Sequence, residues 1–139
     1  IGALNGTVAG AGAVIATACD MRIAAESAKI AYLFTRVGLS GADMGAAWML
    51  PRIVGLAKAS ELLMTGDFIS AGEAHRIGLY NRVVADGEAL NAATELACKL
   101  ADLIDGADSL RLVELGDEIL PLPKHDLHSH LAHNHKHQV

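Results

Sequence analysis

The chain has 139 residues, a net charge of −5 and a composition that is 52% hydrophobic but only 4% aromatic, which suits one domain with an aliphatic core. Lys and Arg form no cluster, so nucleic acid is not an expected partner. No apolar run reaches the length of a membrane span. The two cysteines, Cys19 and Cys98, lack the spacing of a zinc site and are expected to be reduced.

The first twenty residues predict a strand over 1–4, a loop of small residues and a buried helix over 13–19. Gly10 and Gly12 flank Ala11 in the loop, where small side chains let a ligand approach the backbone closely. N–H groups at a helix N-terminus favour an anion, or an oxygen that becomes anionic during a reaction. The third glycine of a dinucleotide-binding loop and the lysine of a P-loop are absent. Close packing of a helix on a strand explains the same small residues, so both interpretations stay open.

The rest of the chain alternates short strands with helices, which indicates an α/β fold. Ser70 and Glu73 form a capping box at the start of one helix, and Pro51 is expected near the end of another helix or at a kink in it. The expected strands are residues 1–4, 21–25, 29–33 and 79–84, and the expected helices are residues 13–19, 44–50, 56–64, 70–77, 88–103 and 110–120. Because the first strand starts at residue 1, we expect further strands of the sheet upstream of this chain.

Four stretches, in order and in register, resemble the crotonase family, which is also called the enoyl-CoA hydratase/isomerase family. They are ALNGTVAGAG, ACDMRIAAESAKI, VGLSGADMGAAWMLPRIVG and KASELLMTGDFISAGEAHRIGLYNRVV. The resemblance implies an α/β crotonase-like (ClpP/crotonase-type) fold, truncated, with the N-terminal strands missing. It divides the chain into a partial crotonase-like domain at 1–103, a divergent segment at 104–124 and a His-rich tail at 125–139.

The resemblance also implies a chemistry. Family members bind an acyl-CoA thioester and hold its carbonyl oxygen between two backbone N–H groups, which stabilise an enolate-like intermediate. Register places one of these N–H groups at Ala11, with Gly12 beside it, whereas the other belongs to an upstream loop that this chain lacks. No metal and no cofactor besides the CoA thioester are implied. The family further implies a homo-oligomer, trimer or hexamer, in the cytoplasm or, for a eukaryotic protein, in the mitochondrial matrix.

The carboxylates separate two reactions of the family. Hydratases use two glutamates, and register places Val14 and Phe34 at those positions, neither of which carries a proton. Asp43 lies where family isomerases, such as the dienoyl-CoA isomerases, carry an aspartate that moves a proton. An N-cap for a helix that begins at Met44 is a compatible second role for Asp43.

The expected function is therefore an isomerase-like reaction on acyl-CoA thioesters, with this chain alone weak or inactive. The alternative is a non-catalytic fragment or pseudoenzyme that keeps only the fold and its oligomer contacts.

Six of the seven histidines lie in the tail, at positions 125, 128, 130, 133, 135 and 137. Such a density of histidine recruits transition metals, but the spacing is irregular. We expect the tail to be disordered and any metal bound there to be adventitious.

Overall fold

The computed structural model describes residues 1–103 and 113–115, and within them the chain forms two small sheets surrounded by helices. The larger sheet is parallel, with the strand order β6-β3-β1-β7. Its strands are β1 (Gly2–Leu4), β3 (Arg22–Ala25), β6 (Arg82–Val84) and β7 (Val113–Leu115). In the smaller sheet β4 (Lys29–Ala31) pairs in parallel with β2 (Thr7–Ala9) and antiparallel with β5 (Ile69–Ser70).

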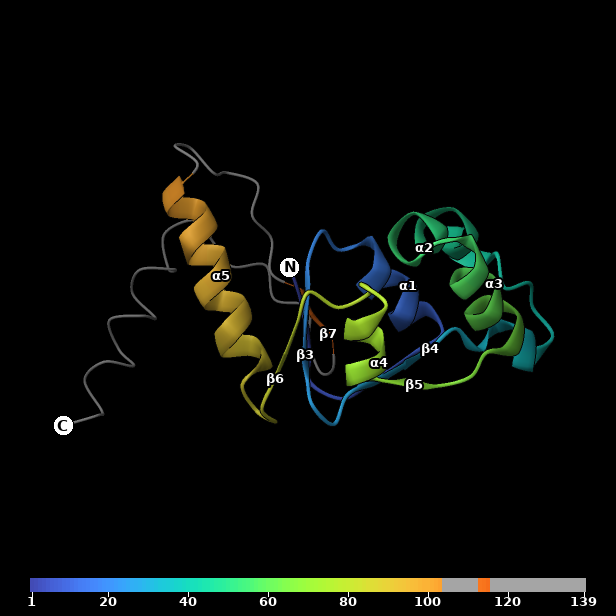
Figure 1. The fold of residues 1–139 in the computed structure, drawn as a ribbon, viewed down its shortest axis with the longest axis horizontal. Helices are drawn as coiled ribbons and strands as arrows, with labels where there is room; N and C mark the ends of the chain where they lie inside the picture. The colour runs from blue at the N-terminus through green and yellow to red at the C-terminus, as the bar shows by residue number, and fades with distance from the viewer. Residues whose placement is uncertain (104–112, 116–139) are drawn as a thin grey trace.

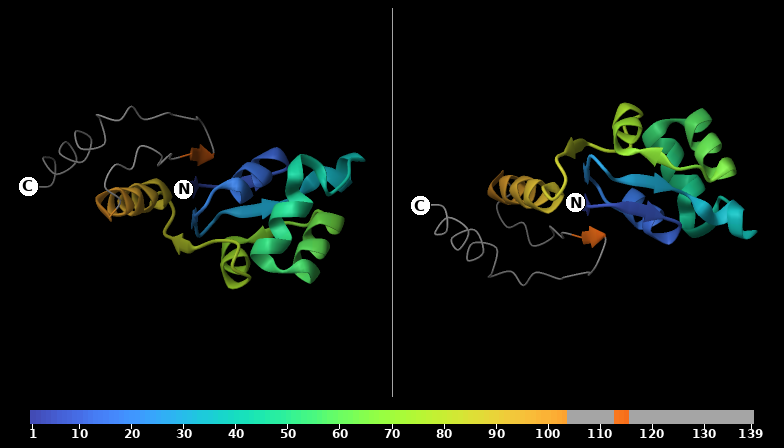
Figure 2. Two further views of the ribbon diagram at one scale, coloured as in Figure 1. Left: turned by 90° about the horizontal axis from the view of Figure 1, so that it is seen from above. Right: turned by 90° about the horizontal axis from the view of Figure 1, so that it is seen from below.

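The helices cover both faces of the larger sheet (Figure 1). They are α1 (Ala11–Ala18), α2 (Ala46–Val54), α3 (Leu56–Thr65), α4 (Ala71–Arg76) and α5 (Ala89–Leu103), with short 3-10 turns η1 (Leu33–Val37) and η2 (Asp43–Gly45). Helix α5 lies on one side of the sheet and the other helices lie on the opposite side, as both views in Figure 2 show. The two sides therefore have separate cores.

Successive residues of the central strands alternate between these two cores, as a pleated strand requires. Ala3 and Ile23 pack with Ala93 and Ala97 of α5. Leu4 instead packs into the larger cluster, on the side of helices α1 to α4. The middle of the sheet is thus buried on both faces, which is typical of parallel strands.

Alanine dominates the fully buried positions. The alanines with no exposed surface are Ala3, Ala13, Ala16, Ala24, Ala25, Ala46, Ala59, Ala71, Ala74, Ala89 and Ala93. The core is also aliphatic, as the composition predicts, although Tyr32, Phe34 and Tyr80 are buried in it as well. With methyl groups at so many contacts, helices and strands approach one another closely.

Most of the predicted elements are confirmed, and one expectation is wrong. A helix over 110–120 is excluded at residues 113–115, where β7 pairs with β1; the alternation of Val113 and Leu115 around Glu114 suits a strand on an open sheet edge. Pro51 lies within α2 and near its end, as predicted, because the helix continues only to Val54. The remaining residues of the expected helix lie outside the described residues, as do the segment at 104–112 and the His-rich tail.

The other differences are smaller. Strands β2 and β5 are not predicted from the sequence, and their formation depends on pairing with the predicted strand β4. Ser70 caps α4 as predicted, with its hydroxyl accepting a hydrogen bond from the Glu73 backbone N–H at 3.2 Å. In the described part of the chain, no helix combines the length and the apolar character that crossing a membrane requires.

Candidate active site

The N-terminus of α1 presents backbone donors that have no acceptor among the described residues. Gly10 precedes the helix with a φ of 55°, a left-handed conformation that favours glycine. Its carbonyl oxygen accepts hydrogen bonds from the N–H groups of Ala13 and Val14, at 3.1 and 3.3 Å. Within residues 1–103 and 113–115, the N–H groups of Ala11 and Gly12 have no acceptor. They are therefore available to an oxygen of a ligand, on the side that the helix dipole makes positive.

The helix thus begins two residues earlier than the sequence predicts. Ala11 occupies its first position and Gly12 its second, and the side chain of Ala11 is exposed. The sequence-derived oxyanion donors therefore lie at a helix N-terminus rather than in a loop before it.

The two positions that the family resemblance assigns to the hydratase glutamates are apolar and buried. Val14 is 3% exposed and Phe34 is 7% exposed, and both belong to the large core cluster. Neither side chain can accept or donate a proton.

Asp43 lies in η2, which packs against α1. The expectation that Asp43 caps the following helix is wrong, because α2 begins at Ala46 and its N-cap is Gly45, with no side-chain hydrogen bond. Two left-handed residues, Met44 (φ 53°) and Gly45 (φ 83°), turn the chain between Asp43 and α2. The exposed Asp43 carboxylate instead accepts a hydrogen bond from the Met44 N–H at 2.9 Å.

The left-handed conformation of Met44 is costly for a residue with a side chain, by about 1–3 kcal/mol. Strain of this kind concentrates at functional sites. The strained residue is the direct sequence neighbour of Asp43.

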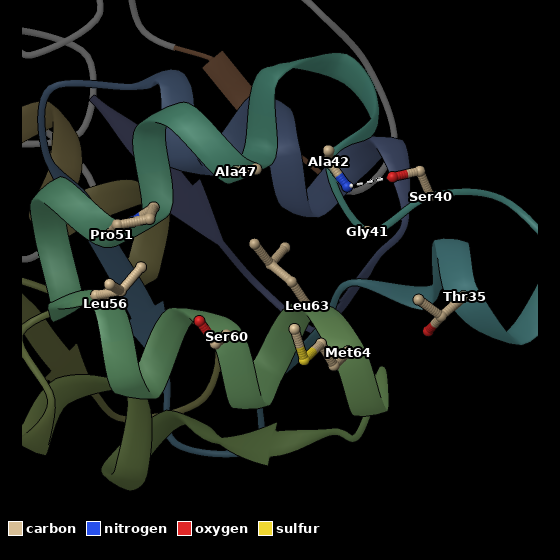
Figure 3. Close-up of a pocket in the computed structure, with 10 residues that line it drawn as sticks. All are labelled: Thr35, Ser40, Gly41, Ala42, Ala47, Pro51, Leu56, Ser60, Leu63 and Met64. Atoms are coloured by element: carbon tan, nitrogen blue, oxygen red, sulfur yellow. Dashed lines mark hydrogen bonds between the residues drawn. The ribbon is translucent and has the colours of Figure 1, made fainter.

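A cavity of about 330 Å³ opens between α2, α3 and the loop that precedes Asp43 (Figure 3). Its surface is mainly apolar. It is lined by Thr35, Ser40, Gly41, Ala42, Ala47, Pro51, Leu56, Ser60, Leu63 and Met64. At Gly41 a side chain would collide with the backbone carbonyl of Leu63, so the loop packs directly on α3. The Ala42 N–H donates to the Ser40 hydroxyl at 3.1 Å, which fixes the local turn before Asp43.

The opposite end of α1 is held by Arg22, a role that the sequence does not reveal. Arg22 is only 5% exposed, and its Nη1 donates to the backbone carbonyls of Ala16 and Thr17 in the last turn of α1 and of Cys19, the residue that follows the helix. Its Nε donates to the carbonyl of Leu79 at 2.6 Å. Burial lowers the pKa of Arg22 below its ordinary value, and no carboxylate of the described residues forms an ion pair with it. The helix carbonyls and the helix dipole stabilise its charge instead.

Replacing Arg22 with methionine is expected to lower the free energy of unfolding by about 2–4 kcal/mol, because several buried carbonyls lose their donor. Urea denaturation followed by circular dichroism measures the change. Arg82→Met is the matched control, since Arg82 is exposed on the neighbouring strand β6 and should change stability by less than about 0.5 kcal/mol. Equal effects of the two substitutions would contradict the anchoring role.

Stability is also expected to depend on alkaline pH. Burial raises the pKa of Tyr32 from about 10 to about 12, and burial also raises that of Tyr80. Because the unfolded chain releases these protons at lower pH than the folded one, stability that is present below pH 10 is lost as the pH rises towards 12.

Between pH 10 and pH 12, the ionisation of Tyr32 is expected to lower the free energy of unfolding by about 2–3 kcal/mol. Urea denaturation between pH 9 and pH 12 measures it as a difference between the wild-type chain and Tyr32→Phe. A parallel decline in both proteins would contradict the assignment to Tyr32.

Comparisons with known proteins identify the family of this chain. The model of the enoyl-CoA hydratase/isomerase family matches residues 1–111. The 1,2-epoxyphenylacetyl-CoA isomerase of Escherichia coli is 44% identical over 99 residues, which cover 71% of this chain and 37% of that protein. A Streptomyces coelicolor protein assigned as an enoyl-CoA hydratase has a crystal structure with 58% identity and a TM-score of 0.70, covering 72% of this chain and 36% of the other.

A Thermobifida fusca protein, whose crystal structure was solved in complex with CoA, is 34% identical with a TM-score of 0.68; the match covers 73% of this chain and 39% of that one. The chain thus spans between 36% and 39% of the length of these relatives. The matched region contains the N-terminus of α1, the buried positions of Val14 and Phe34, and Asp43. The chain therefore belongs to the enoyl-CoA hydratase/isomerase family, and its α/β architecture is the crotonase fold.

Proposed function

We propose that the protein containing this chain acts on acyl-CoA thioesters through an enolate whose oxygen is bound at the N-terminus of α1. The observation that supports this proposal is the pair of N–H groups at Ala11 and Gly12, which donate a hydrogen bond to no described residue. Hydrogen-bond donors fixed before the reaction stabilise the negative charge as it develops on the carbonyl oxygen. The Ala11 N–H is the direct donor, and Gly12 lies beside it.

We further propose a shift of a double bond rather than an addition of water. Asp43 removes a proton from a carbon next to the conjugated system, and the electron pair moves onto the thioester oxygen to form the enolate. The same carboxyl group returns the proton to a different carbon, and the enolate collapses to the isomer. One proton carrier is sufficient for this exchange. Hydration also requires a water molecule held by polar groups, and Val14 and Phe34 supply none.

The second donor of the oxyanion hole is expected from a segment that this chain does not contain. A chimera supplies it: the part of the Streptomyces coelicolor protein that precedes the matched region is joined to Ile1. Double-bond shift and water addition are assayed in parallel on enoyl-CoA substrates, for the chimera and for the 139-residue chain.

We expect the chimera to shift the double bond faster than it adds water. The chain alone should be slower by about 100-fold or more, because one oxyanion donor is absent. Faster hydration by the chimera would overturn the isomerase assignment. A complete lack of turnover would favour the alternative, a non-catalytic fragment or pseudoenzyme that keeps the fold and its oligomer contacts.

We also propose that the protein self-associates. Large apolar side chains are exposed on and around α2 and α3: Val37 at 70%, Trp48 at 64%, Leu56 at 73% and Met64 at 75%. Apolar surface of this kind promotes association. Light scattering should report a mass above that of the monomer, whereas a clean monomer that binds no hydrophobic dye would contradict the proposal.

A further inference from the structure

Helix α1 and strand β4 are joined by a buried pair of hydroxyl groups. The Tyr32 hydroxyl, directly after β4, lies 2.5 Å from the Thr17 hydroxyl in the last turn of α1. Tyr32 is 1% exposed and Thr17 is 3% exposed. Thr17 is the one polar residue of a helix that is otherwise made of alanine, glycine, valine and isoleucine. A buried polar contact of this kind has a defined geometry, because neither hydroxyl has water to replace its partner.

The direction of these hydrogen bonds follows from the number of protons. The Thr17 hydroxyl has a single proton, and it donates that proton to the carbonyl of Ala13 at 2.7 Å. Tyr32 must therefore donate to Thr17. The proton of Tyr32 is retained at neutral pH, since burial raises its pKa to about 12.

These contacts belong to a closed ring. From Ala13 the ring continues through the Ala13 N–H to the carbonyl of Gly10, at 3.1 Å. The Gly10 N–H in turn donates to the carbonyl of Ala31 at 3.0 Å, and Ala31 is bonded covalently to Tyr32 (Figure 1 shows α1 above β4). The ring passes through Gly10 and Ala13, the residues that flank Ala11 and Gly12 in the first turn of α1.

We propose that Tyr32 and Thr17 are positioning residues that fix the first turn of α1, and with it the Ala11 N–H, relative to the thioester oxygen. This inference rests on the proposed function, since the donors need a substrate oxygen to act on. Neither side chain touches the substrate: Tyr32 acts through Thr17, and Thr17 acts through the Ala13 carbonyl. Removal of either hydroxyl should loosen the first turn while the rest of the sheet stays unchanged.

The chain offers a matched control in Tyr80. Tyr80 is 1% exposed in the same core cluster, and among the described residues its hydroxyl has no hydrogen-bond partner. Tyr32→Phe and Tyr80→Phe therefore remove the same atom from the same core, but only the first breaks the ring. In the same way, Thr17→Val removes the hydroxyl without changing the shape of the side chain, and Thr17→Ser retains it.

The test measures amide hydrogen exchange of the 139-residue chain by NMR, and kcat and KM of the chimera. For Tyr32→Phe and Thr17→Val, the amides of Ala13 and Val14 should exchange about tenfold faster, while those of Ile23 and Ala24 in β3 stay within about twofold. In the chimera, kcat should fall about tenfold with little change in KM. Tyr80→Phe and Thr17→Ser should stay close to wild type in both measurements.

Uniform acceleration of the α1 and β3 amides, or equal effects of Tyr32→Phe and Tyr80→Phe, would overturn the inference and leave Tyr32 a packing role. An inactive wild-type chimera would instead overturn the proposed function. In that case the exchange data still decide whether the ring fixes the first turn of α1, so the two failures are distinguishable.

Discussion

Replacing Ala11 with proline is expected to lower the turnover of the chimera by about 100-fold or more, with almost no loss of stability. Proline lacks the backbone N–H, so the substitution removes the proposed oxyanion donor and nothing else. Proline is well tolerated at the first position of a helix, which Ala11 occupies, and the Ala11 N–H has no acceptor among the described residues. The free energy of unfolding should therefore change by less than about 1 kcal/mol.

The measurements are kcat and KM on an enoyl-CoA substrate, together with urea denaturation. Ala11→Ser is the control, because it changes the exposed side chain but keeps the N–H, and it should retain most of the activity. Unchanged turnover in a folded Ala11→Pro protein would show that the thioester oxygen is not bound at this position.

Replacing Asp43 with asparagine is expected to reduce double-bond shift by about 100-fold or more, the usual size of a general acid/base contribution. Asparagine keeps the shape of the side chain, and its amide oxygen can still accept the hydrogen bond from the Met44 N–H. Because Asp43 is exposed and does not cap α2, stability should change by less than about 1 kcal/mol.

The matched control is Asp67→Asn. Asp67 is also an exposed loop carboxylate, but it pairs with Arg36 at the surface, so its loss should leave turnover near that of the wild type. Both the double-bond shift and the addition of water are measured. Robust hydration that survives Asp43→Asn would contradict the proton-carrier role, and the carboxylate would then serve only the local turn.

The sequence predicts the elements of the fold whose signal is local. The amphipathic pattern of α5 and the N-cap of Ser70 each lie within one helix, and both are confirmed, although the Glu73 carboxylate of the predicted capping box pairs with Arg76 instead. Strands β2, β5 and β7 are two or three residues long, and their pairing partners are distant in the chain. A periodicity so short carries little information, which explains why two of them are missed and β7 is taken for part of a helix.

In the candidate site, too, local features are predicted from the sequence and features that depend on distant contacts are not. The small-residue loop and the resemblance predict Ala11 and Gly12 as candidate donors. The predicted capping role of Asp43 is wrong, because Met44 takes a left-handed conformation that no sequence pattern indicates. Arg22 and Tyr32 reach α1 from neighbouring strands, and only the tertiary fold brings them there. Thr17 alone gives a signal, as the one polar residue in an apolar helix.

The alanine-rich core determines which substitutions the buried positions tolerate. Where large side chains fill a core, truncation leaves a cavity and is the common cause of damage. At buried positions such as Ala3, Ala16 and Ala24, truncation can remove only one methyl group, whereas each added methyl group must find room in a packed core. Homologous sequences are therefore expected to keep small residues at these positions, even where their surfaces diverge. In laboratory evolution, larger side chains at these positions should be rejected more strongly than truncations at other positions.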